Sequence, residues 1–297
     1  MYTKITSQEL DFFELTSLSV KVFINRLIEI FIVVFLIITP VRIADLLISN
    51  YICKPDQHPF ISMLITIIEY FIILIPTMML ILVADSEINN LKVKLGHIFK
   101  KTIFLWKGAI ITNILEGFIT FALLLLLIIP GIVWSVYYIF SSQAVTLHNL
   151  TGKEALNYSK FLVRGRWWKV FLITLAYGVI YFIIFWILKI PKNAAGNMID
   201  LKLVLIPVRE LANAFLIVAS SLLYINLYSM VEKGDREEKP AMLDYLLTKT
   251  GGEIDDCEVD FDYGQENDEL ACPECGCKLQ DIDIFCPECG KEIIKEE

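Results

Sequence analysis

Four cysteines near the end of the sequence have the spacing of a metal site. Cys272 and Cys275 are separated by two residues, Cys286 and Cys289 repeat that spacing, and a glycine follows each pair. A C-x-x-C turn presents two thiolates to one ion, and two such turns complete the tetrahedron that Zn²⁺ prefers. Since no coordination position stays open, the site would be structural rather than catalytic. We therefore predict one structural Zn²⁺, whose binding folds the segment.

Two other chemistries of the same cysteines stay open, a pair of redox dithiols or two disulfides. Zinc is favoured because paired C-x-x-C motifs in a reducing compartment are typical of metal sites. Six of the seven cysteines also lie after residue 256, unlike the even spread of a disulfide scaffold. Cys277 would be a spare thiol, and Cys257 has no evident partner. On this motif the segment 270–297 resembles the zinc-ribbon family.

Ionisable residues inside long apolar stretches form a second candidate site. Glu69, Glu116 and Arg209 all lie in such stretches. An ionisable side chain at mid-bilayer costs at least about 2.5–3.5 kcal/mol, so it usually faces the interior of a helix bundle or water. These residues would serve a substrate or proton path, or would hold the helices together through an ion pair and hydrogen bonds. The three histidines share no spacing, and we expect them to be solvated.

A third group combines basic and aromatic residues. Tryptophan favours the membrane interface, and each nearby cation gains about 1 kcal/mol from anionic head groups. The group would bind a lipid or an anionic ligand, or it would only anchor the chain and set its topology. Its members are Arg164, Arg166, Trp167, Trp168 and Lys169.

The elements that must position these residues are membrane helices. Of the 297 residues, 56% are hydrophobic and 20% charged, which leaves too little polar surface for a soluble domain. The apolar residues fall into blocks of roughly the 20 residues that cross a bilayer as a helix. We predict an all-α polytopic fold with six spans. Pro40 would end the first span, and Pro130-Gly131 would form the turn between the third and fourth. The spans are 22–39, 60–84, 103–129, 132–147, 170–190 and 203–231, with amphipathic interfacial helices before the first, third and fifth.

Charge predicts the orientation and the domain boundaries. Residues 1–231 hold 19 basic and 13 acidic residues, whereas the remainder holds 7 and 21. Basic residues cluster before the first span, around 92–101, around 153–169 and after the last span, which places both termini in the cytoplasm. We predict a six-helix domain over 1–231, an acidic disordered linker over 232–269 and the zinc ribbon over 270–297. Phosphate would repel the acidic tail, which argues against a nucleic-acid partner.

The order of motifs in the membrane part is similar to that of a known family. Ile128–Trp134 with its Pro-Gly pair, then Glu154–Lys160, then Arg164–Val170 resembles the glycerophosphodiester phosphodiesterase membrane-domain family and its YciC-type relatives. The resemblance covers roughly residues 90–230. It implies a six-helix bacterial membrane domain without an established activity. The soluble phosphodiesterase domain of some relatives is missing, so no diester hydrolysis is carried over.

The functional expectation follows from these sites and from the lack of any catalytic motif. We expect a non-enzymatic protein of the bacterial inner membrane that binds or helps move a lipid-like or small anionic ligand. Its partners would be membrane lipids and a cytoplasmic protein that docks on the zinc ribbon. Two alternatives stay open: a secondary transporter or permease that uses Glu69, Glu116 and Arg209, and an intramembrane enzyme.

Overall fold

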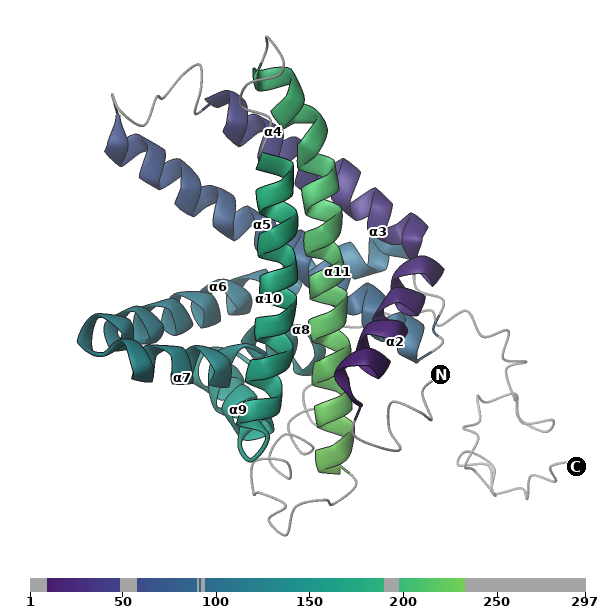
Figure 1. The fold of residues 1–297 in the computed structure, drawn as a ribbon, viewed down its shortest axis with the longest axis vertical. Coiled ribbons are helices and arrows are strands. Elements are labelled where there is room, and N and C mark those ends of the chain that lie inside the picture. The colour runs from purple at the N-terminus through teal and green to yellow at the C-terminus, as the bar shows by residue number, and fades with distance from the viewer. Residues whose placement is uncertain (1–9, 49–57, 90, 92–93, 190–197, 233–297) are drawn as a thin grey trace, which may run out of the picture. The chain divides into compact units, whose positions relative to one another are not determined.

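The computed structural model describes residues 10–48, 58–89, 91, 94–189 and 198–232 (Figure 1). They belong to the first of two compact units, residues 1–258 and 259–297. All regular secondary structure in these described ranges is helical, as predicted. The predicted zinc ribbon, and the predicted linker beyond residue 232, lie outside them.

The first span is a broken helix that continues past Pro40. Helix α2 (Phe12–Asn25) ends at Arg26, and α3 (Leu27–Val33), a π-helix (Val34–Ile38) and α4 (Thr39–Leu47) follow without interruption. The prediction that Pro40 closes this span is wrong. The wide π turn precedes the proline, whose missing N–H is tolerated because it falls in the first turn of α4. The span therefore extends to Leu47.

The next two helices are longer than predicted. Helix α5 (Pro59–Ile88) has 30 residues and holds Pro76 in its interior, and α6 (Leu95–Leu126) has 32. The amphipathic helix that we expected before the third span is therefore the first part of α6 itself. A separate amphipathic helix does precede the first span, as α2, and the fifth, as α9 (Lys153–Val163).

The third and fourth spans form a hairpin with a turn at a single residue. Leu127 separates α6 from α7 (Ile128–Tyr138), so Pro130 and Gly131 lie in the first turn of α7 rather than in the connection. A Cβ on Gly131 would lie 2.9 Å from the Leu124 Cα, which shows how closely the two arms approach. The fourth span is also divided, because the chain bends after Tyr138 before α8 (Ser141–His148) begins.

Helix α11 (Met198–Glu232) is the centre of the helix packing. It packs against α2, α4, α5, α9 and α10 (Trp167–Lys189) (Figure 1). In the most apolar 18 residues of α11, 72% of the residues are buried, whereas in those of α6 only 11% are. The exposed surface of the outer helices is therefore largely apolar, as lipid requires and water does not.

Six segments of the described chain are long and apolar enough to cross a membrane, which confirms the predicted number. This is the pattern of a multi-pass membrane protein. The segments are Leu27–Leu47, Pro59–Ile88, Leu95–Leu126, Ile128–His148, Trp167–Trp186 and Leu205–Val231.

Candidate functional site

Four charged residues from three helices meet inside the bundle; we call them the arginine–glutamate network. The Arg42 guanidinium on α4 lies 2.7 Å from Glu69 Oε1 on α5, and its Nε lies 3.3 Å from Glu210 Oε1 on α11. The same Glu210 oxygen accepts hydrogen bonds from Arg209 Nη2 at 3.0 Å and from Arg209 Nε at 3.2 Å. Both arginines therefore converge on one carboxylate oxygen.

The carboxylates of this network are buried and the arginines are not. The Glu210 and Glu69 side chains are 2% and 9% exposed, whereas those of Arg42 and Arg209 are 29% and 33% exposed. A carboxylate that is kept out of water needs such partners, because an isolated buried charge is costly. The buried glutamates thus hold two arginines whose side chains stay partly exposed. Planar guanidinium groups are suited to bind carboxylate or phosphate.

The network lies well inside its helices. Glu69 is ten residues from the start of α5 and Arg209 eleven from the start of α11, so each lies about 15 Å from a helix end at 1.5 Å per residue. On the predicted topology both starts are on the outer side of the membrane. The network would then lie nearer to that side than to the cytoplasm.

Two of the three predicted residues meet here, and the third does not. Glu69 and Arg209 are linked through Arg42 and Glu210. Glu116 on α6 instead accepts a hydrogen bond from Ser141 Oγ on α8. One turn away, Tyr70 donates to Asn113 Oδ1 at 3.0 Å, so α5, α6 and α8 share a second polar cluster.

Sequence reasoning missed Arg42 as a member of the site. A first span that ends at Pro40 leaves Arg42 in a connection outside the bilayer. The available signal was the apolar residues that continue after the proline, Val41, Ile43, Leu46 and Leu47. Their spacing extends the helix by two turns and places Arg42 among apolar neighbours, where a charge needs a partner.

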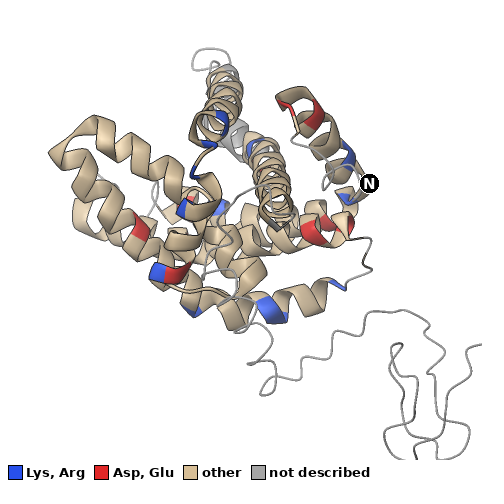
Figure 2. Ribbon diagram, turned by 90° about the horizontal axis from the view of Figure 1, so that it is seen from below, with Lys and Arg blue, Asp and Glu red and all other residues tan. Residues whose placement is uncertain are grey.

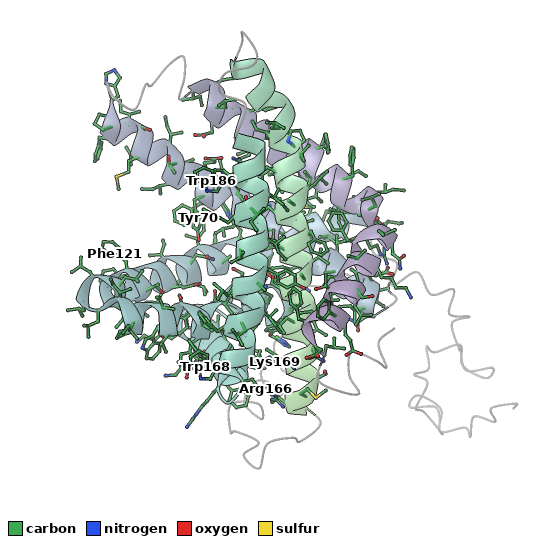
Figure 3. All side chains as sticks on the ribbon, in the orientation of Figure 1. Tyr70, Phe121, Arg166, Trp168, Lys169 and Trp186 are labelled. Atoms are coloured by element: carbon green, nitrogen blue, oxygen red, sulfur yellow. The ribbon has the colours of Figure 1, made fainter. Side chains whose placement is uncertain are left out.

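The basic-aromatic residues form the corner between α9 and α10, Arg164 to Lys169, at the lower end of α10 (Figure 3). Gly165 has a φ of 88° and makes the turn. The two tryptophans differ, because Trp168 is 70% exposed while Trp167 donates its indole N–H to the Val133 carbonyl oxygen on α7 at 3.2 Å. Only Trp168 has the exposure of an interfacial anchor; Trp167 joins the corner to the hairpin.

His148 corrects the expectation that all three histidines are solvated. Its ring lies 5.0 Å from the ring of Tyr228, 5.3 Å from that of Tyr158 and 5.9 Å from that of Tyr224. The three tyrosines come from α9 and α11, so the end of α8 is packed into the bundle. No sequence spacing could show this, because the contacts join distant helices.

No metal site lies within the described ranges: they hold no group of three or more His, Cys, Asp or Glu residues placed to bind an ion. The predicted zinc cysteines, Cys272, Cys275, Cys286 and Cys289, lie outside those ranges. Comparisons with protein-family models, curated proteins and solved structures give no match for this chain. The family resemblance and the zinc ribbon therefore stay predictions.

Proposed function

We propose that this chain is a non-enzymatic protein of the bacterial inner membrane that binds, and helps move, a lipid-like or small anionic ligand. Arg42 and Arg209 would contact the anionic group, and Glu69 and Glu210 would hold the two guanidinium groups in place. The basic residues of the α9–α10 corner would contact anionic head groups at the inner interface. The zinc ribbon would dock a cytoplasmic partner.

One observation carries the proposal, the difference in exposure within the arginine–glutamate network. In a network that only joins helices, the arginines would be as fully buried and hydrogen-bonded as the glutamates, since every unpaired donor in a bilayer is costly. Arg26 is such a case: its side chain is 15% exposed and contacts Glu29, Glu87 and the Leu91 carbonyl oxygen. Arg42 and Arg209 are about twice as exposed as Arg26.

A thermal-shift experiment on the purified full-length protein in detergent tests this site. Phosphatidylglycerol should raise the unfolding temperature of the native protein more than phosphatidylcholine of the same chain length, because a ligand that binds only the folded state stabilises it. Inorganic phosphate is a third arm. Stabilisation by phosphate alone would identify a small anion, and stabilisation by the lipid alone would identify a lipid head group.

Two matched arginine variants complete the experiment. Arg209→Gln should remove at least half of the shift caused by the anion, measured against its own unliganded midpoint. Arg26→Gln should keep the full shift, although it also breaks an ion pair between helices. Binding at the α9–α10 corner is common to both variants and cancels. Equal shifts in the two variants would contradict the proposed site.

A secondary transporter is the second candidate, and one observation favours it. Glu69 and Arg209, two of its three predicted coupling groups, are part of one network. Against it, Glu116 belongs to the separate cluster with Ser141. Proteoliposomes distinguish the candidates. Flux of the stabilising anion that Arg209→Gln abolishes would favour the transporter, and binding without flux would favour the first proposal.

A further inference from the structure

The turn between α6 and α7 differs in sequence from the other predicted outer connections. Residues 121–133 contain no polar side chain, and the turn itself reads Leu126-Leu127-Ile128-Ile129. By contrast, the connection 49–57 holds Asn50, Lys54, Asp56 and Gln57, and the connection 190–197 holds Lys192, Asn193 and Asn197. A turn that emerges into water on the far side of a membrane would need such residues, because helix ends leave backbone groups that must be solvated or capped.

The apolar side chains at this turn are exposed on both arms of the hairpin. Leu125 and Leu126 at the end of α6 are each 73% exposed, and Ile128 and Ile129 at the start of α7 are 69% and 76% exposed. Figure 2 shows no charged residue at this closed end. The leucine at the turn provides no side-chain cap to α7. Hydrocarbon is the environment that suits such a surface.

The position of the turn follows from contacts of α7. Val133 accepts the hydrogen bond of the Trp167 indole, and the Lys160 ammonium lies 4.2 Å from the ring centre of Trp134. The middle of α7 is therefore level with the corner where α10 enters the bilayer. Leu127 is only six residues before Val133, which is about 9 Å along a helix, whereas the hydrocarbon core is about 30 Å thick.

We propose that the α6–α7 hairpin is re-entrant: its closed end lies in the hydrocarbon of the leaflet it enters and is covered by lipid acyl chains. Four segments would then cross the membrane completely, and the hairpin would begin and end on the same side as the chain termini. The predicted orientation is unchanged, because two crossings are removed together. This inference is independent of the arginine–glutamate network, which α6 and α7 do not join.

Acyl chains fit the closed end better than a second copy of this chain. A protein partner would cover one face of the hairpin, and apolar exposure would be confined to that face. Here the exposed residues lie on both arms and on the turn, and they include Phe118, Phe121 and Ile132. Figure 1 shows α6 and α7 side by side, with their closed end pointing away from α10 and α11.

Cysteine labelling in membranes tests the inference. Leu127→Cys and, separately, Ile129→Cys are placed in a full-length chain that also carries Cys53→Ser. A membrane-impermeant maleimide is applied to spheroplasts and, in parallel, to inverted vesicles, and the modified peptide is quantified by mass spectrometry. The native chain, with Cys53 in a predicted aqueous connection, is the positive control. Two separate positions at the turn guard against a single variant that misfolds.

The expected result is that Cys53 reacts from one side, while the two hairpin cysteines react at least about tenfold less from either side and react fully after denaturation in SDS. Labelling of either hairpin cysteine to the extent of Cys53, from the outer side, would show a hairpin that crosses the membrane and would overturn the inference. A disulfide between two copies through Leu127→Cys would also overturn it, since the covering surface would then be protein.

Discussion

Replacing Glu210 by Gln should destabilise the domain more than any other single change in the arginine–glutamate network. The glutamine keeps the shape of the side chain and removes the charge to which both arginines bind. Arg42 would keep Glu69 as its partner at 2.7 Å, but Arg209 would lose the carboxylate that it contacts through two nitrogens. Glu210 is therefore the residue on which the two halves of the network depend.

The magnitude follows from burial. Breaking a fully buried ion pair costs about 3–5 kcal/mol, because one charge is left without compensation. Here the carboxylate is 2% exposed, but the arginines are 29% and 33% exposed and recover part of the loss by solvation. We therefore expect Glu210→Gln to lower the free energy of unfolding by about 2 kcal/mol.

Reversible unfolding in mixed micelles, followed by circular dichroism as SDS is increased, measures this change. Glu29→Gln is the matched control. Glu29 also pairs with an arginine, Arg26, at 3.2 Å and three residues away, but the Glu29 side chain is 28% exposed and not buried. That control should cost no more than about 0.5 kcal/mol. If Glu210→Gln cost as little as Glu29→Gln, burial would not set the strength of the network and the reasoning would fail.

Two further predictions concern the hairpin and the tail. Gly131→Ala should destabilise the hairpin by about 1–3 kcal/mol, because the added Cβ meets Leu124 within 2.9 Å and overpacking forces the arms apart. Gly117→Ala on the same hairpin has open space and should be neutral in the same SDS titration; equal losses would contradict this explanation. The purified chain should contain about one zinc ion by metal analysis, since four ligands complete one tetrahedral site. Cys272→Ser should lose both the zinc and any crosslink to a cytoplasmic partner without loss of membrane insertion; retained zinc would exclude the predicted site.

The sequence predicted the membrane helices well, because a run of apolar residues of sufficient length is enough to specify a span. Its errors lie at positions where local signals compete with packing. Pro40 reads as a stop, but a π turn accommodates it within a continuing helix. Pro130-Gly131 reads as a turn, but Leu127 makes the turn and Gly131 lets the arms approach.

The candidate site was predicted only in part, for a related reason. That Glu69 and Arg209 would need partners follows from their apolar surroundings. Which partners they find depends on how α4, α5 and α11 are rotated and shifted relative to one another. The 3.6-residue periodicity of each helix does not predict that rotation or shift between separate helices. Glu116 also finds a partner, but in a different place: it accepts a hydrogen bond from Ser141, just after the bend that follows α7. The sequence did not predict that bend.

The first and last described helices are held together, and this has a consequence for biogenesis. The Leu10 amide donates to Asn226 Oδ1 at 3.3 Å, although 216 residues separate them, and α2 packs along α11. At ribosomal rates of about 5–20 residues per second, the amino-terminal helix must wait roughly 10–40 s for its partner to be synthesised. During that interval the apolar residues of α2 lack the surface of α11 that covers them in the folded domain, so α2 reaches its final packing only after α11 has been synthesised.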